Sequence, residues 1–411
     1  MNNIRSYALV TFAYWGFTVT DGALRMLVVL HFYKLGYSDV TIAFLFLFYE
    51  FFGIVTNLLG GWIASRSGLK VTLYGGLALQ IFALLMLGLL QPSWARLLSV
   101  SYVMTAQALS GIAKDLTKMS AKSAIKVVVP DDTGSTLFKW VSRLTGSKNA
   151  LKGAGFFVGS VLLSTLGFVG SLVAMAAGLL VVLLGTVVAL PPEIGRSKKK
   201  TKFTSLFSKS PAINWLSSAR LFLFGARDVW FVVGLPVFLS QLGWTFNGVG
   251  AFIALWFIGY GIIQAFVPDI LRSIGRNKVD GPAARHWAFI LLLAPLALIG
   301  ALRAGLNPSV SLMVGLAVFA VLFAINSAVH SYLVLAYTDK DSVALNVGFY
   351  YMANAGGRLL GALLSGLIFQ LAGFSGCLWG SATMVLLAAT ISFGLPGGNP
   401  IQVNTAIEVG E

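Results

Sequence analysis

The sequence contains one cysteine, Cys377, and three histidines. A single thiol cannot form a disulfide framework, and so few thiol and imidazole groups provide no credible zinc or other thiolate-metal site. The glycine pairs that would suggest a dinucleotide loop lie inside long apolar runs with no strand before them. No nucleophile–base set stands out either. We therefore expect no cofactor, no metal and no enzymatic reaction.

Charged residues are also scarce, at 10% of the 411 residues, whereas 57% are hydrophobic. Soluble globular proteins have roughly 25% charged and about 45–50% apolar residues. So few charges cannot cover so much apolar surface in water, which excludes soluble enzymes, disordered chains and coiled coils. The surplus apolar surface must face lipid, and the 45 glycines suit close packing of helices in a membrane.

Long apolar runs recur along the whole chain, and each is long enough to cross about 30 Å of hydrocarbon as a helix. Their apolar residues are continuous rather than alternating, which excludes the strands of a membrane β-barrel. The first run is too long for a signal peptide and has no small-residue cleavage site after it. We predict an all-α integral membrane protein with twelve transmembrane helices, at residues 6–33, 40–64, 70–90, 96–124, 140–167, 170–190, 212–240, 246–271, 284–302, 309–335, 343–372 and 375–395.

Lysine and arginine indicate the orientation in the membrane. The net charge is +15, and most basic residues fall at the N-terminus and in the even-numbered connections. The odd-numbered connections hold only Lys34, Arg96 and Arg303. Because cytoplasmic loops are enriched in these residues, we predict that both termini and the basic segment 193–210 are cytoplasmic.

The basic segment separates two sets of six predicted helices. We predict an N-terminal bundle at 1–192, a cytoplasmic linker at 193–210, a C-terminal bundle at 211–398 and a cytoplasmic tail at 399–411. The bundles match in order at an offset of 206–207 residues, which indicates a 6+6 parallel repeat whose halves rock about a central site. The matches are residues 35–38 with 242–245, Asp21 with Asp228, Asn57 with Gln264, Gly68 with Gly275, Lys152 with Arg358, Gly155 with Gly361, and Gly167-Phe168 with Gly373-Phe374.

Ionisable residues inside the predicted spans mark the expected functional site, because a charge in hydrocarbon is costly. Every third predicted helix holds essentially none, which fits a bundle whose third helices face lipid. An unpaired buried cation is expensive, so an excess of cations implies an anionic ligand, although Lys118 and Lys148 are also placed to extend to the cytoplasmic interface. More than four positions from the ends of the spans there are eight cations and four anions. The cations are Arg25, Lys114, Lys118, Lys148, Lys152, Arg220, Arg227 and Arg358, and the anions are Asp21, Glu50, Asp115 and Asp228.

Shared helix faces narrow this set, because residues three, four or seven apart lie on one side of a helix. Arginine suits phosphate, arsenate or carboxylate because its planar group donates two hydrogen bonds. Ion pairing is the alternative role, with Asp21 available to Arg25 and Asp115 available to Lys114. The predicted substrate-binding residues are Arg25, Lys114, Lys118, Lys152, Arg220, Arg227, Tyr350, Asn354 and Arg358.

Coupling to a proton requires a group that changes its charge during the cycle, and Glu50, Asp21 and Asp228 are the candidates. Glu50 has no partner close in sequence and is therefore the leading candidate. Asp21 and Asp228 occupy matching positions in the repeat and are equally suited to be fixed partners of Arg25 and Arg227. We expect proton entry from outside to drive the return step.

A glycine-rich segment follows the predicted second helix. It resembles the cytoplasmic signature loop of the major facilitator superfamily at Gly61, Arg66, Gly68 and Lys70. It departs from that loop at Ser65, where the family usually has aspartate, and at Leu69, where the family often has arginine. A tight turn with positive-inside residues is the alternative interpretation. Together with the 6+6 repeat, the resemblance implies a pseudo-symmetric major facilitator fold.

Three segments are similar to the ArsJ-type organoarsenical efflux transporters: residues 21–37, beginning DGALRMLVVLHF, residues 48–62, FYEFFGIVTNLLGGW, and residues 113–126, AKDLTKMSAKSAIK. The resemblance implies export of 1-arseno-3-phosphoglycerate across a bacterial inner membrane, which would give arsenate resistance. It also implies a functional partner, a glyceraldehyde-3-phosphate dehydrogenase that makes this ester by using arsenate in place of phosphate.

Other functions remain open from the sequence. An organophosphate/phosphate antiporter, or another organic-anion transporter, needs the same cations and differs in selectivity. A membrane receptor or scaffold is a different class, and charges inside both halves argue against it. An exporter of apolar drugs would need fewer cations in its cavity than the spans of this chain contain, which argues against that function.

Overall fold

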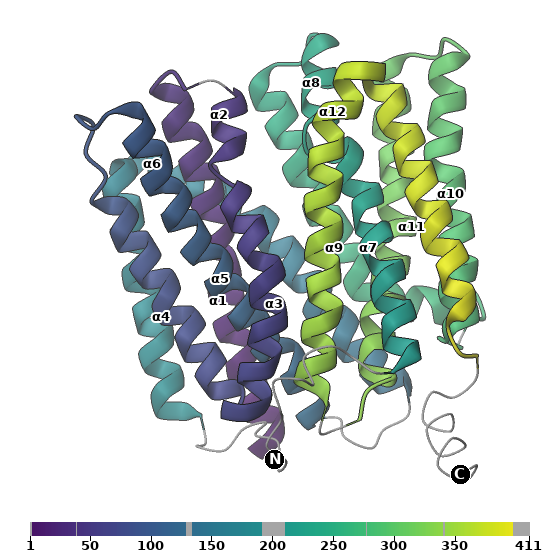
Figure 1. The fold of residues 1–411 in the computed structure, drawn as a ribbon, viewed down its shortest axis with the longest axis horizontal. Helices are drawn as coiled ribbons and strands as arrows, with labels where there is room; N and C mark the ends of the chain where they lie inside the picture. The colour runs from purple at the N-terminus through teal and green to yellow at the C-terminus, as the bar shows by residue number, and fades with distance from the viewer. Residues whose placement is uncertain are drawn as a thin grey trace. The chain divides into compact units, whose positions relative to one another are not determined.

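The computed structural model describes residues 2–37, 39–128, 134–190, 210–276, 278–339 and 342–397. Every regular element in these ranges is a helix, as Figure 1 shows, which confirms the predicted all-α class for the described chain. The elements are α1 (Asn2–Lys34), α2 (Asp39–Phe44), α3 (Leu47–Ser67), α4 (Leu69–Gly88), α5 (Arg96–Val128), α6 (Gly134–Ala189), α7 (Pro211–Phe231), α8 (Gly234–Gln241), α9 (Phe246–Ser273), α10 (Gly281–Arg303), α11 (Pro308–Ala336), α12 (Val343–Ile391) and the short 3-10 helix η2 (Ser392–Gly394).

Glycines with positive φ reproduce the predicted repeat. Such backbone angles are readily adopted only by glycine, so these positions mark where the chain turns. In the described ranges, Gly305 has no counterpart, and the other six glycines form three pairs with offsets of 207, 207 and 206 residues. The pairs are Gly36 (φ 74°) with Gly243 (83°), Gly68 (88°) with Gly275 (72°), and Gly167 (68°) with Gly373 (63°).

The last of these pairs interrupts the two longest elements. α6 has 56 residues and α12 has 49, and each contains one residue with non-helical backbone angles, Gly167 and Gly373 respectively. Figure 1 shows α12 rising to a bend and then running back. Each element is therefore two helical arms, which fits the separate spans predicted at 140–167 and 170–190, and at 343–372 and 375–395.

Local sequence signals define where helices of the second half begin. Prolines occupy the first turns of α7, α10 and α11, where a missing backbone N–H costs nothing. Three side chains cap free N–H groups at helix starts. Thr245 accepts from the Gly248 N–H (3.1 Å), Asp280 from that of Ala283 (3.0 Å) and Asn307 from that of Val310 (3.2 Å).

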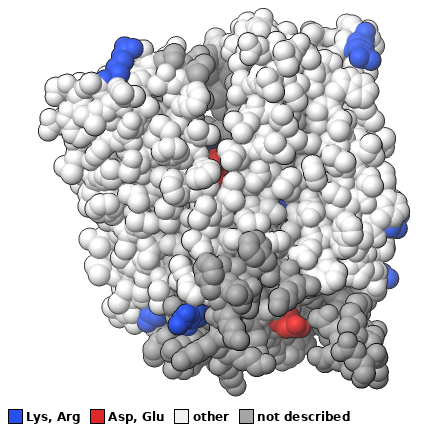
Figure 2. Space-filling view, in the orientation of Figure 1, with Lys and Arg blue, Asp and Glu red and all other residues white. Residues whose placement is uncertain are grey.

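In the described part of the chain, eight helices are long and apolar enough to cross a membrane, and they include both two-armed elements. α1 and α5, with 33 residues each, are not among the eight, because their charged and polar residues lower their hydropathy. On the face drawn in Figure 2, charged residues are scarce across the middle and show mainly towards the ends. The chain is a multi-pass membrane protein, and the number of twelve spans and the cytoplasmic placement of both termini stay predictions.

The described chain divides into two compact units, and each is treated by itself below. Unit 1 comprises Met1–Pro130, Ser147–Phe207 and Lys340–Met352, and unit 2 comprises Asp131–Gly146, Ser208–Asp339 and Ala353–Glu411. The start of α6 thus groups with unit 2 and the start of α12 with unit 1, which the predicted boundaries do not anticipate. The predicted linker 193–210, apart from Ser210, and the predicted tail 399–411 lie outside the described residues.

Candidate functional site

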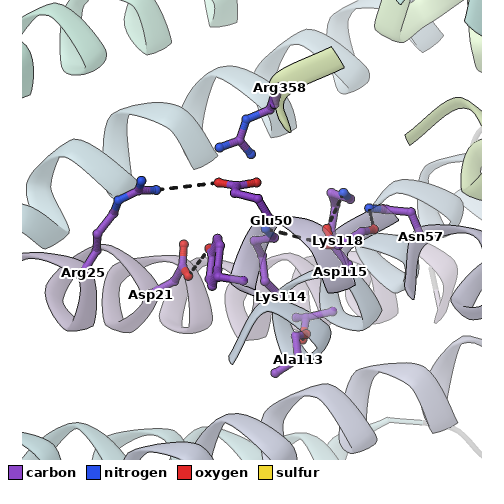
Figure 3. Close-up of polar contacts among 12 residues, drawn as sticks. Asp21, Arg25, Glu50, Asn57, Ala113, Lys114, Asp115, Lys118 and Arg358 are labelled. Carbon is purple, nitrogen blue, oxygen red and sulfur yellow. Dashed lines mark hydrogen bonds and ion pairs between the residues drawn. The ribbon is translucent and has the colours of Figure 1, made fainter. Parts of the chain in front are cut away.

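In unit 1, Asp21 of α1 receives contacts from two other helices. Its Oδ2 accepts a hydrogen bond from Nζ of Lys152 in α6 at 2.9 Å, and its Oδ1 accepts one from the Tyr49 hydroxyl of α3 at 2.5 Å. Lys114 Nζ of α5 lies 3.8 Å from the centre of the Tyr49 ring. Asp21 is only 5% exposed, so Lys152 stabilises a buried negative charge. Figure 3 shows Asp21 together with Lys114.

A second carboxylate of unit 1 lies between two lysines of its own helix. Asp115 in α5 is 1% exposed, and its Oδ1 accepts a hydrogen bond from Lys118 Nζ at 2.5 Å. Its Oδ2 lies 3.7 Å from Lys114 Nζ. Lys118 Nζ also lies 4.5 Å from the centre of the Tyr351 ring. The ion-pairing role that the sequence left open for Lys114 is therefore present in the structure.

Arg25 and Glu50 form a further ion pair of unit 1, with 3.9 Å between Arg25 Nη1 and Glu50 Oε1. The Arg25 guanidinium also lies 4.9 Å from the centre of the Phe46 ring. The sequence made Asp21, four residues earlier, the available partner of Arg25, but Asp21 pairs with Lys152 instead. Glu50 has no oppositely charged residue close to it in sequence, but the fold brings Arg25 beside it.

In unit 2, Asp228 of α7 lies between two arginines. Its Oδ1 accepts from Arg227, at 2.6 Å from Nε and 2.5 Å from Nη2, and its Oδ2 accepts from Nε of Arg358 in α12 at 3.3 Å. Asp228 is 3% exposed. Pairing of Asp228 with Arg227, one of the two roles predicted for this aspartate, is found.

The two aspartate sites are equivalent in the repeat. Asp21 and Asp228 are 207 residues apart, and their cation partners Lys152 and Arg358 are 206 residues apart. In each half of the repeat, an aspartate on the first long helix, α1 or α7, therefore pairs with a cation on the first arm of the two-armed element, α6 or α12. The second contact differs, since it comes from the neutral hydroxyl of Tyr49 in unit 1 and from the cation Arg227 in unit 2.

Glycines bring these helices close together in both units. A Cβ added to Gly155 of α6 would lie 2.5 Å from the Val19 carbonyl oxygen of α1. A Cβ added to Gly361 of α12 would lie 2.7 Å from the Gly225 carbonyl oxygen of α7. Glycine allows this backbone approach, which holds the helix that carries each aspartate against the helix that carries its cation.

Arg220 of α7 lies in a buried polar cluster of unit 2. It is 2% exposed, its guanidinium carbon lies 3.8 Å from the centre of the Phe224 ring, and its Nη1 donates to the Ser327 carbonyl oxygen at 3.3 Å. Gln264 Nε2 donates to Ser327 Oγ at 2.9 Å. His330, one turn further along α11, is 1% exposed, and its Nδ1 has no hydrogen-bond partner among the described residues.

The predicted polar stripe of α12 passes from one unit to the other. Tyr350 is fully buried in unit 1, with its ring 5.0 Å from that of Tyr351. Asn354 and Arg358 belong to unit 2. Asn354 is 8% exposed, and its Nδ2 has no hydrogen-bond partner within the described ranges. Substrate contact by these residues stays a prediction.

The signature loop has two glycines with distinct structural roles. A Cβ on Gly61 would lie 2.5 Å from the Ala344 carbonyl oxygen and 3.1 Å from Gly348 Cα, so Gly61 lets α3 meet the start of α12 inside unit 1. Gly68 has φ 88° and forms the break between α3 and α4.

The two basic residues of this loop make local contacts. Lys70 Nζ donates to the Leu190 carbonyl oxygen at 3.0 Å, just beyond the end of α6. A cation there satisfies a carbonyl that the helix leaves free. The Arg66 guanidinium lies 5.5 Å from the centre of the Trp62 ring. The Lys70 contact ties α4 to the end of α6, whereas the Arg66 contact stays within α3.

Sequence reasoning missed the neutral residues that organise the charges. Tyr49 contacts Asp21 and lies against Lys114, and Tyr351 lies against Lys118. Tyr49 precedes Glu50, which was the only available signal for it. The search of the described residues for three or more His, Cys, Asp or Glu arranged to hold a metal finds no such group.

This chain is similar to known membrane transporters in its sequence profile and in its fold. The sequence profile of the Major Facilitator Superfamily matches residues 7–279, and none of the curated proteins matches the sequence. A bacterial homologue of the iron transporter ferroportin, in an outward-facing state, has a TM-score of 0.73 at 16% identity, over 94% of this chain and 98% of that one. The human organic anion transporter MFSD10 gives 0.71 at 14% identity, over 95% and 100%. The proton:xylose symporter XylE gives 0.75 at 12% identity, over 95% of each chain. Identities this low show a shared fold alone.

Proposed function

Because this chain belongs to the major facilitator superfamily, whose members are generally transporters and not enzymes, we propose that it exports an anionic organoarsenical. The proposed substrate is 1-arseno-3-phosphoglycerate, and the proposed location is a bacterial inner membrane. Transport proceeds by alternating access, in which the substrate site opens first to one side of the membrane and then to the other. The transport is coupled to protons and gives the cell resistance to arsenate.

The observation that carries this proposal is the charge of unit 2. Among their described residues, α7 and α12 hold three arginines and one aspartate, a net of two positive charges (three minus one). Arg220 and Arg227 are 2% and 6% exposed. Excess positive charge in a membrane interior favours an anion. Arginine supplies the donor geometry that phosphate and arsenate groups accept.

Unit 1 adds a second set of cations. Four cations of this unit form ion pairs with three acids, and these cations are Arg25, Lys114, Lys118 and Lys152. The proposed substrate carries a phosphate and an arsenate group. Both are hard oxyanions, which cations bind without any thiol. A single buried cysteine is therefore compatible with an arsenic-containing substrate.

The choice of an arsenic ester is supported by the ArsJ-type resemblance. The similar segments contain charged residues of all three ion-pair groups of unit 1. These are Asp21, Arg25, Glu50, Lys114, Asp115 and Lys118. A glyceraldehyde-3-phosphate dehydrogenase in the cytoplasm is the proposed source of the ester, and export prevents its hydrolysis back to arsenate inside the cell.

An organophosphate/phosphate antiporter is the second candidate function. The same arginines and lysines bind a sugar phosphate, so the two candidates differ in what the protein selects and exchanges. The following experiment separates them.

The test is uptake into everted, energised membrane vesicles. The vesicles receive the dehydrogenase, its substrates and radiolabelled arsenate, and a parallel sample contains phosphate in place of arsenate. We expect arsenic to accumulate only when the dehydrogenase is active. Arg358→Ala should reduce accumulation about tenfold or more, because it removes charge-assisted hydrogen bonds to the anion.

The matched control is Arg303→Ala, which removes the same side chain at the exposed end of α10. It should transport like the parent. In Arg358→Ala, Asp228 keeps its contact with Arg227, so the buried aspartate retains a cation. Accumulation without the dehydrogenase, or equal transport of a sugar phosphate in exchange for phosphate, would support the antiporter instead.

A further inference from the structure

The two units surround equivalent aspartates with different partners. From this difference we infer that Asp21 carries the coupled proton, and that the proton moves in the same direction as the anion. The inference rests on the proposed anion transport. The inference selects Asp21 from the three candidate proton carriers, which also include Glu50 and Asp228. It replaces the expectation from the sequence that protons enter the cell as the substrate leaves.

Asp228 keeps a cation even when one arginine binds substrate. Each of its oxygens meets a different guanidinium, Arg227 on Oδ1 and Arg358 on Oδ2. An anion that draws Arg358 away leaves Arg227 in contact. Asp228 therefore keeps a cation partner through the cycle and acts as a fixed counter-ion.

Among the described residues, Asp21 has no second cation in direct contact. Lys152 makes its ion pair at 2.9 Å, and the contact to the other oxygen comes from the neutral hydroxyl of Tyr49. An anion that binds Lys152 removes this ion pair and places a new negative charge beside a carboxylate that is 5% exposed. A buried carboxylate in that situation is stabilised by binding a proton.

The other charges near Asp21 do not take over the role of Lys152. Lys114 acts on Asp21 from α5, but its Nζ lies over the Tyr49 ring and 3.7 Å from Asp115. Arg25, on the same helix as Asp21, pairs with Glu50 of α3. Arg25 is thus balanced by Glu50, whereas Lys114 shares the single charge of Asp115 with Lys118 and makes no direct contact with Asp21.

The proposed step exchanges partners and conserves charge and atoms. The anion takes the place of the Asp21 carboxylate on Lys152 Nζ, and a proton from water on the entry side forms an O–H bond with an Asp21 oxygen. When the anion leaves on the other side, this O–H bond breaks, the proton goes to water and Asp21 pairs with Lys152 again. Anion and proton each raise the affinity for the other, so they travel together. Export of a polyanion with one proton is still driven by an inside-negative membrane potential.

The test uses the full chain in lipid nanodiscs with glycerol 3-phosphate as the probe anion. Calorimetry measures the anion bound, and a pH indicator in weak buffer measures protons taken up or released. We expect the wild type to take up about one proton more per bound anion than Asp21→Asn, and its affinity to fall up to tenfold for each unit rise in pH. Protonation of the probe itself is common to both proteins and cancels in this difference.

Asp228→Asn is the matched variant, because it changes the equivalent aspartate. Its proton uptake per bound anion should equal that of the wild type, whatever its affinity. Tyr49→Phe keeps the Asp21 carboxylate and should also retain proton uptake. If Asp21→Asn fails to fold, the wild type is measured at about pH 8, two units above the second phosphate pKa of about 6, where the free probe carries no exchangeable proton and the sign of the signal decides the direction.

The outcomes separate this inference from the proposed function. Anion binding with release of protons, or with no difference between wild type and Asp21→Asn, overturns the inference and leaves anion transport standing. Loss of proton uptake in Asp228→Asn but not in Asp21→Asn overturns the choice of Asp21. Failure of the wild type to bind glycerol 3-phosphate or any arsenylated analogue overturns both.

Discussion

The contact between α1 and α6 allows a sharp test of the packing in unit 1. We expect Gly155→Ala to destabilise the protein, because the new Cβ would lie 2.5 Å from the Val19 carbonyl oxygen and 3.1 Å from Gly22 Cα. Optimal carbon contacts lie at about 3.5–4.0 Å. Both neighbouring atoms belong to the backbone, so no side chain can rotate away, and the two helices must separate.

The control for this substitution is Gly178→Ala on the second arm of the same element. Gly178 is exposed, and a Cβ there meets nothing within 4 Å. Alanine is favoured over glycine in a helix by about 1 kcal/mol, and both variants receive this gain. Overpacking costs about 1–3 kcal/mol. The difference between the two variants should therefore be about 1–3 kcal/mol, with Gly155→Ala the less stable.

The assay is unfolding in detergent, followed by intrinsic tryptophan fluorescence, with the two variants compared in parallel. The repeat provides an independent replicate in unit 2, where Gly361→Ala should destabilise and Gly366→Ala, which meets nothing within 4 Å, should not. Equal stability of Gly155→Ala and Gly178→Ala would refute the reasoning, because it would mean that α1 and α6 do not approach as closely as described.

Three further outcomes are expected. Lys70→Met should lower the free energy of unfolding by about 0.5–1.5 kcal/mol through loss of its hydrogen bond to Leu190, without changing anion affinity in the nanodisc assay. Asp115→Asn should destabilise by about 3–5 kcal/mol, because it leaves two lysines around a buried neutral group, and Asp115→Glu should recover part of this loss in the same unfolding experiment. Arg220→Lys should weaken binding of glycerol 3-phosphate by about tenfold, because lysine lacks the planar fork, and unchanged affinity would place Arg220 outside the binding site.

Much of the fold could be predicted from the sequence because the repeat leaves a local signature. Turn glycines such as Gly68 and Gly167 must adopt backbone angles that other residues avoid, so both copies retain them. Matching of Asp21 with Asp228, and of Lys152 with Arg358, likewise predicted equivalent positions, and the structure places each acid against the matching cation.

The partners of individual charges could not be predicted in the same way. Asp21 and Arg25 are one turn apart on α1, which made pairing between them plausible. The actual partners, Lys152 and Glu50, come from other helices, and their approach depends on how α1, α3 and α6 pack. That packing depends on small residues such as Gly155, whose meaning is clear only once its neighbour is known. The sequence shows which charges are buried but not which of them meet.

The exchanged starts of α6 and α12 have a consequence for how the protein is made. A ribosome that has completed residues 1–192 has already supplied Asp131–Gly146, which groups with unit 2, but it has not yet supplied Lys340–Met352, which completes unit 1. Unit 1 is therefore complete only after a segment near the C-terminal end of the chain has been synthesised. Gly61 then gains its neighbour Gly348. Because neither half contains all the residues of one unit, we expect two separately expressed halves to become resistant to protease only when they are produced together in one membrane.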